Sequence, residues 1–326
     1  MVFLSLGWWP ETSAGAERRP AGRGRRLVPH RFAGTAANSA DSDRCTVDTR
    51  PVVSIIIPAH NEERVLPRLL EALEAGGTSP MEVVVVANGC TDGTAEVARR
   101  AGTTVIETPV PSKIRALALG DRSATTFPRI YVDGDVVLGR SDVAALCDAL
   151  GDGVHAVGPT RVLPMEGVPR AVRWYYEIWQ RLDGVRSELY GRGVVVVSER
   201  GHERLRDWPE TMSDDLQMAM SFAPAERRVV ADAQVVIMPP RSYRDLLRRR
   251  VRAMTGNARM AADPRAPAVR RSGAGLPAIA RIVREEPRLV GAAGVFLATA
   301  AVAKLLGRRA VRRGDTAWLR DESSRR

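Results

Sequence analysis

Two carboxylates separated by one glycine, Asp133-Gly134-Asp135, interrupt the apolar segment RIYVDGDVVLG. Carboxylate oxygens so closely spaced suit a hard divalent cation such as Mg²⁺ or Mn²⁺. An Asp-Gly pair flanked by β-branched residues is also a strong signal for a hairpin turn between two strands. The segment alone therefore leaves two interpretations open, a metal site and a plain turn.

The neighbouring elements decide between these interpretations. Four β-branched runs predict strands over residues 52–57, 82–86, 103–106 and 130–132. Helical patterns lie between them, and Asn61 is expected to cap the first helix, beginning at Glu62. This alternation predicts an α/β fold with a Rossmann-like, doubly wound, mainly parallel sheet.

In such a sheet, ligands bind beyond the carboxyl ends of the strands. Three polar clusters fall at those ends: Pro58-Ala59-His60-Asn61-Glu62, Ala87-Asn88-Gly89 and Asp133-Gly134-Asp135. The run that follows Asp135 is short and meets Gly139 at once, which disfavours an immediate return strand. We therefore expect the two aspartates at a strand end that faces the ligand.

Five segments occur in an order and spacing that resemble a family-two glycosyltransferase with the GT-A fold: VSIIIPAHNEE, VVVVANGCTDGT, PSKIRALALGD, YVDGDVVL and SDDLQ. The resemblance covers roughly residues 51–260, which we take as a catalytic domain. It implies an inverting enzyme that uses a nucleotide-diphosphate sugar as donor and Mg²⁺ or Mn²⁺ as cofactor.

The resemblance also implies roles for individual residues. Asp135 would be the direct metal ligand, Asp133 would contact the ribose or the metal, and Gly134 would let the backbone approach the ligand. The other expected donor-binding residues are Pro58, Ala59, His60, Glu62, Asn88, Lys113, Arg249 and Arg252. Asn88 stands where relatives usually carry an Asp that accepts a hydrogen bond from the base, so the base stays open.

Asp214 and Asp215 match the acidic pair that supplies the general base in this family. We expect Asp215 to take the proton of the acceptor hydroxyl and Asp214 to orient it. From the residues alone, Ser213-Asp214-Asp215 is equally suited to start a helix. By resemblance, Gly191, Arg192 and Gly193 lie on the acceptor side.

The basic segment LLRRRVRAMTGN, which contains Arg249 and Arg252, resembles one that closes over the donor diphosphate in processive relatives. There it ends in Arg-Trp, whereas here Ala253 follows Arg252. This difference argues against a processive synthase, and a solvated basic helix is an equal alternative for the segment.

Charge is distributed unevenly along the 326 residues, whose formal net charge is +11. Residues 241–326 carry 21 basic and 7 acidic side chains, whereas residues 51–240 carry 20 basic and 26 acidic ones. A basic flank on a mildly acidic core favours an anionic membrane surface over nucleic acid as partner. Solvated arginines remain the alternative.

The two ends of the chain differ from the core. Residues 1–50 lack hydrophobic periodicity and are expected to be disordered. Residues 261–326 are expected to form a basic helical region with a membrane-associating helix over 287–307, either peripheral or weakly spanning. The cysteines Cys45, Cys90 and Cys147 are scattered, which fits a reducing cytosol and argues against a zinc site.

The sequence thus predicts a glycosyltransferase on the cytoplasmic side of the plasma membrane, acting on a lipid-linked or cell-envelope glycan. A sugar-nucleotide nucleotidyltransferase is the first alternative, although PAHNEE lacks the glycines of its phosphate loop. A membrane-associated nucleotide-sugar binder without catalysis is the second, and the acidic pair Asp214-Asp215 opposes it.

Overall fold

The computed structural model describes residues 53–75, 80–205, 218–262 and 275–313, so the predicted disordered segment 1–50 lies outside it. Its strands are β1 (Ser54–Ala59), β2 (Glu82–Asn88), β3 (Thr104–Thr108), β4 (Arg129–Val132), β5 (Val136–Leu138), β6 (Ala156–Val162), β7 (Val194–Val197) and β8 (Arg227–Ile237). Its helices are α1 (Leu66–Glu74), α2 (Thr94–Arg100), α3 (Lys113–Ser123), α4 (Arg140–Asp148), α5 (Arg170–Trp179), α6 (Asp183–Ser187), α7 (Glu199–His202), α9 (Tyr243–Ala262), α10 (Leu276–Glu285) and α11 (Val290–Arg312).

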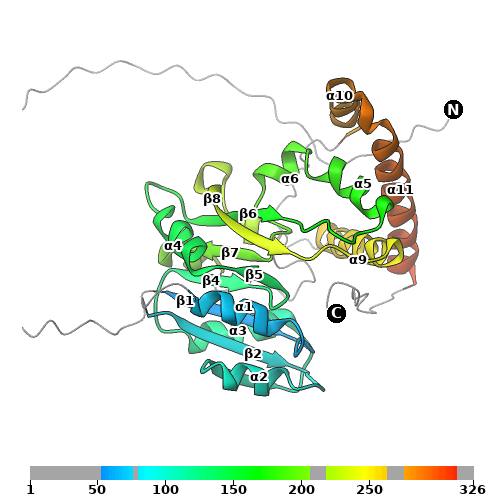
Figure 1. The fold of residues 1–326 in the computed structure, drawn as a ribbon. Coiled ribbons are helices and arrows are strands. Elements are labelled where there is room, and N and C mark those ends of the chain that lie inside the picture. The colour runs from blue at the N-terminus through cyan, green and yellow to red at the C-terminus, as the bar shows by residue number, and fades with distance from the viewer. Residues whose placement is uncertain (1–52, 76–79, 206–217, 263–274, 314–326) are drawn as a thin grey trace, which may run out of the picture.

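The strands form one curled sheet in the order β3-β2-β1-β4-β7-β6-β8-β5 (Figure 1). In the first half, β1 pairs in parallel with both β2 and β4, and β2 pairs in parallel with β3. The helices between these strands provide the crossover connections that parallel pairing requires. The predicted α/β fold with a mainly parallel sheet is confirmed.

The second half of the sheet is mixed. β7 runs antiparallel to β4 and to β6, and β8 pairs in parallel with β6. β5 pairs antiparallel with β8, at the far end of the sheet from β4. The segment Asp133–Asp135 is therefore not a hairpin, because the strands on its two sides do not pair with each other.

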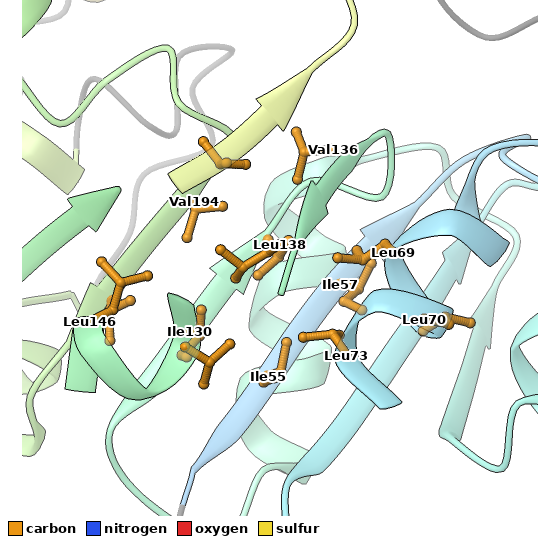
Figure 2. Packing of buried hydrophobic residues seen from close by; sticks show 14 of the residues in the cluster. Ile55, Ile57, Leu69, Leu70, Leu73, Ile130, Val136, Leu138, Leu146 and Val194 are labelled. Carbon is orange, nitrogen blue, oxygen red and sulfur yellow. The ribbon is translucent and has the colours of Figure 1, made fainter. Parts of the chain in front are cut away.

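Aliphatic side chains hold α1 against the sheet, as Figure 2 shows. Ile55 and Ile57 of β1 are fully buried beneath Leu69 and Leu73 of α1. The apolar residues of α1 recur every three or four positions and so share one face of the helix. Burying each such side chain contributes about 1.5–3 kcal/mol, which fixes the strand ends that carry the polar clusters.

The C-terminal helices surround a second apolar cluster. α5, α9, α10 and α11 contribute Tyr175, Leu246, Ile279 and Phe296 to it, and the rings of Tyr175 and Phe296 stack at 5.1 Å. The predicted helical C-terminal region is thus present. The division of the chain at residue 260 stays a prediction, and α9 continues to Ala262.

Candidate active site

Two loops at the carboxyl ends of β1 and β2 are joined by hydrogen bonds. The Oδ1 atom of Asn61 accepts from Thr91 N at 2.7 Å. The backbone N–H of Glu62 donates to Thr94 Oγ1 at 2.8 Å, and Thr94 is completely buried. Since these bonds link residues about thirty positions apart, the two loops form one rigid wall of the site.

The expected helix start at Glu62 is wrong. α1 begins at Leu66, and Asn61 adopts a left-handed backbone with φ of 51°. Asparagine tolerates this conformation better than most residues. Its side chain therefore joins the two loops instead of capping α1.

Asn88 ends β2 and is 4% exposed. Its Nδ2 atom donates to the carbonyl of Ala59 at 2.7 Å and lies 3.4 Å from that of Val86. These two carbonyls fix the orientation of the amide, because turning it over would place Oδ1 against the carbonyl oxygens. No described residue donates to Oδ1, so Asn88 offers its site an acceptor alone, as an aspartate would.

His60 lies next to Asn88 at the same edge. Its Nδ1 atom is 2.6 Å from the backbone carbonyl of Asn88, which orients the half-buried imidazole ring. The carbonyl of Ala59 is occupied by the Asn88 amide. The residues expected to cradle the base are therefore placed together by the structure.

The turn that carries the aspartates is held from two sides. Asp133 N donates to Gly193 O at 2.8 Å, and Val136 N donates to Asp133 O at 3.3 Å, which closes a tight turn at the end of β4. Lys113, the first residue of α3, places its Nζ atom 2.5 Å from Asp133 Oδ1. Lys113 and Asp133 are thus in contact at a tight turn, and a cation at this turn stays a prediction.

A steric conflict, which the sequence did not reveal, explains why position 134 is a glycine. A Cβ atom at this position would lie 2.0 Å from Oε2 of Glu62, which is 6% exposed. Glu62 therefore packs its carboxylate directly against the turn. This explains the middle glycine without any contact to a ligand.

A pocket opens beside this turn. Its lining residues are Pro58, Lys113, Leu117, Tyr131, Val132, Asp133, Gly193, Val194, Val195 and Met218. Met218 follows the predicted catalytic pair Asp214 and Asp215 by a few positions, and those two aspartates lie outside the described residues.

The three expected acceptor-side residues have different surroundings. Gly193 has φ of +67°, and a Cβ there would lie 2.7 Å from Val136 Cγ1 and 3.3 Å from Asp133 Oδ2. Gly191 also has a positive φ, of +69°. Both positions favour glycine for backbone reasons, and Gly193 directly supports the aspartate turn.

Arg192 is a buried structural residue, 2% exposed. Its guanidinium donates to the carbonyls of Pro159 at 2.7 Å, Glu188 at 2.8 Å and Arg186 at 2.8 Å. Burial lowers the pKa of Arg192 to about 9, so the group stays protonated at neutral pH. With its donors occupied by backbone, this side chain is not placed to bind an acceptor, contrary to the expectation from sequence.

Arg249 and Arg252 lie on α9 and not on the strand-end loops. The Nη1 atom of Arg249 is 3.5 Å from the carbonyl of Met238, which follows β8, and both side chains are half-buried. Their role over a diphosphate stays a prediction.

A buried polar network behind the pocket was missed from the sequence. Asp121 of α3 accepts from Tyr131 OH at 2.9 Å and Arg129 Nη1 at 2.7 Å, and it lies 2.6 Å from His202 Nε2. Burial, reinforced by Asp121, raises the pKa of Tyr131 well above its ordinary value. Arg129 and Tyr131, at alternate positions of β4, were the feature of the sequence that could have predicted this network.

The chemistry of the turn fits a hard divalent cation. Asp133 and Asp135 supply half-buried carboxylates from one short turn, and Asp133 lines the pocket. Glu62 packs a third carboxylate against this turn. Among the described residues no cluster of three or more His, Cys, Asp or Glu is assembled as a ready-made metal cage. A cation held by one or two carboxylates together with substrate phosphates needs no such cage.

Comparisons with known proteins agree with this geometry. Residues 54–193 match the family model described as Glycosyl transferase family 2. A mannosyltransferase from Pyrobaculum calidifontis, solved in complex with GDP-Man and Mn²⁺, has 23% identity and a TM-score of 0.51, with 82% of this chain and 84% of that chain covered. At this identity the similarity shows the shared GT-A fold.

Two curated relatives match shorter segments. An uncharacterised glycosyltransferase of Mycobacterium tuberculosis is 35% identical over 105 residues, which are 32% of this chain and 46% of that protein. A 4,4'-diaponeurosporenoate glycosyltransferase of Staphylococcus aureus is 36% identical over 96 residues, 28% of this chain and 25% of that protein. The chain thus aligns with about half, or less, of the length of these relatives. Residues 54–193 are thus similar to glycosyl transferase family 2, and the chain shares the GT-A fold.

Proposed function

We propose that the protein transfers a sugar from a nucleotide-diphosphate donor to a hydroxyl acceptor with inversion at the anomeric carbon. The observation that carries this proposal is the Asp133–Asp135 turn beside Lys113. His60 and Asn88 lie at the same edge of the sheet, at the carboxyl ends of β1 and β2. A donor of this class carries a base, a ribose and two phosphates, and the edge offers polar groups suited to each.

The base would bind against Asn88. Since its amide nitrogen is held by the carbonyl of Ala59, Oδ1 is the atom available to accept a hydrogen bond. Uracil and guanine both present an N–H donor, so either is compatible with this acceptor. His60 would pack against the base, with its ring oriented by the Asn88 carbonyl.

The diphosphate would lie at the Asp133–Asp135 turn. Asp135, with Asp133, would hold a divalent cation, Mg²⁺ or Mn²⁺, and a bound cation neutralises charge that develops on the leaving diphosphate. Lys113 adds a compact positive charge at the same place. The mannosyltransferase from Pyrobaculum calidifontis, solved with GDP-Man and Mn²⁺, supports this choice of ligands.

Asp215 would act as the general base. Its carboxylate would take the proton of the acceptor hydroxyl while that oxygen attacks the anomeric carbon and the bond to the diphosphate oxygen breaks. Asp214 would orient Asp215. The position of Met218 in the pocket lining supports this assignment, because the acidic pair precedes it closely in sequence.

For the acceptor, we propose a lipid-linked or cell-envelope glycan, reached from the cytoplasmic side of the plasma membrane. The basic C-terminal helices and the apolar helix Pro287–Arg312 support this class. That helix, alone among the described ones, is long and apolar enough to cross a membrane, with a hydropathy of 2.0.

The first test is a thermal-shift panel of UDP, GDP and their sugars, with and without Mn²⁺. A donor at one hundred times its Kd should stabilise the native state by about 2.7 kcal/mol. Asp135→Asn should abolish the part of the shift that needs Mn²⁺. Asp148→Asn, at an exposed aspartate at the end of α4, is the matched control.

Transfer itself is tested by Asp215→Asn, which should retain the nucleotide shift and lose sugar transfer. Undiminished transfer by this variant would remove Asp215 as the base. A wild-type protein that binds donors without hydrolysis or transfer would be the inactive binder, and one that releases pyrophosphate from a nucleoside triphosphate and a sugar phosphate would be the nucleotidyltransferase.

A further inference from the structure

α11 presents a continuous apolar face to solvent. Its exposed residues Val290, Gly294, Ala298, Ala301, Val302 and Leu305, here called the outer stripe, recur every three or four positions. At 3.6 residues per turn they lie within about one third of the circumference. Val290 is 66% exposed, Val302 41% and Leu305 52%, so the larger members of this stripe remain uncovered.

The opposite face of α11 is already used by the protein. Ala292, Phe296, Thr299, Ala303 and Gly307 are buried against α5 and α9. Thr299 Oγ1 lies 3.0 Å from Tyr243 OH, so a polar pair belongs to this packed face. Figure 1 shows α11 alongside α5 and α9 over its length.

This packing argues against a helix that crosses the bilayer. A crossing α11 would have to leave α5 and α9, and would expose the aromatic and aliphatic residues of the second apolar cluster to water. The charge-free stretch from Leu289 to Ala303 has 15 residues. At 1.5 Å per residue it spans about 22 Å, shorter than the hydrocarbon core of about 30 Å.

Positive charge continues the outer stripe toward the end of the helix. Arg308, Arg309 and Arg312 are exposed and fall on the same side of α11 as Val302 and Leu305. Guanidinium groups bind phosphate oxygens with two parallel hydrogen bonds. One helical face therefore combines an apolar strip with groups that match anionic lipid headgroups.

We propose that α11 lies flat on an anionic membrane surface, with its outer stripe in the interface and its arginines on the lipid phosphates, while its inner face stays packed on the protein. This deepens the membrane location proposed above and rests on it. The helix thus acts as an in-plane anchor of the folded domain and not as a membrane span.

The test uses the purified full-length chain and sedimentation with vesicles of phosphatidylcholine, with or without phosphatidylglycerol. We expect binding only to the anionic vesicles, and release by high salt. Val302→Asp/Leu305→Asp should abolish binding without lowering the melting temperature, because both side chains are exposed.

The role of charge is tested by Arg308→Ser/Arg309→Ser. This double change should weaken vesicle binding on the order of 30-fold, because each of the two arginines loses one contact with the anionic surface. Arg99→Ser/Arg100→Ser is the matched control: both arginines are exposed on α2, far from α11 in Figure 1, and this pair of changes should leave binding unaltered.

Three results would overturn the proposal. They are equal binding to neutral and anionic vesicles, resistance of the bound protein to alkaline carbonate, and binding retained by the Val302→Asp/Leu305→Asp protein. A wild type that ignores vesicles would overturn it as a fourth result, and a dimer dissociated by those two changes would then assign the outer stripe to a second copy of the chain. The thermal shift with nucleotides is measured without vesicles, so a failure of the proposed transfer function can be distinguished from a failure of the membrane proposal.

Discussion

Replacing Arg192 with methionine tests how the chain around Gly193, which lines the pocket, is supported. The change keeps most of the apolar stem of the side chain but removes the guanidinium, which is 2% exposed and bonded to the carbonyls of Pro159, Arg186 and Glu188. Each carbonyl then loses a charged donor in a place that water reaches poorly.

The size of the effect follows from these bonds. A hydrogen bond from a charged donor contributes about 1.5–3 kcal/mol, and the losses at one side chain are not additive. Breaking a buried polar network by removing one member costs about 3–5 kcal/mol. We therefore expect Arg192→Met to lower the free energy of unfolding by about 4 kcal/mol, or the melting temperature by roughly 10 °C.

The assay is urea unfolding followed by tryptophan fluorescence, with Arg186→Met as the control. The Arg186 side chain is exposed, and since the substitution keeps its backbone carbonyl, the change should alter stability by less than about 0.5 kcal/mol. Arg192→Met should also weaken donor binding, because the next residue, Gly193, accepts the hydrogen bond from Asp133 N. A loss of stability below about 1 kcal/mol would refute the assigned role of the guanidinium.

Three further predictions concern other contacts. Gly134→Ala should cost about 1–3 kcal/mol of stability by thermal unfolding, and most of that cost should vanish in a Glu62→Ala background, because the added Cβ meets only that carboxylate within 3.2 Å. Asn88→Asp sets a second acceptor against a backbone carbonyl and should cost about 1–3 kcal/mol in the same assay; an unchanged melting temperature would mean that the amide is oriented the other way. Hydrogen bonds from Arg181 and Arg288 lower the pKa of Glu286 to about 2, so the stabilisation that this carboxylate gives the α10–α11 junction is complete above pH 4.5 and is lost as the pH falls toward 2. Arg181→Met should reduce this acid sensitivity in hydrogen exchange, and an unchanged pH dependence would refute the role of Arg181.

The parallel half of the sheet was predictable because its signal is local. β-branched runs and helical stretches alternate along the chain, and the handedness of crossovers leaves few arrangements for them. For the same reason the strand-end position of Asp133 could be inferred before the structure. Its neighbour in space, Lys113, was also expected there, at the start of α3.

Other features depend on contacts between distant residues. The pairing of β5 with β8 joins segments about a hundred positions apart, and no local pattern marks it. Asn61 is a residue type suited to cap a helix, but its side chain accepts a hydrogen bond from Thr91 in the loop after β2. Arg192 was expected on the acceptor side by resemblance, and only the fold shows the carbonyls that surround its guanidinium.

The hydrogen bonds between the β1–α1 and β2–α2 loops have a thermodynamic consequence. Asn61, Glu62, Thr91 and Thr94 are fixed to one another by the fold itself. Little conformational entropy is then left to lose on this wall if the nucleotide binds there as proposed, and hydrogen exchange there should hardly slow on binding. This wall is ordered before any ligand is present, which would favour binding of the base proposed above.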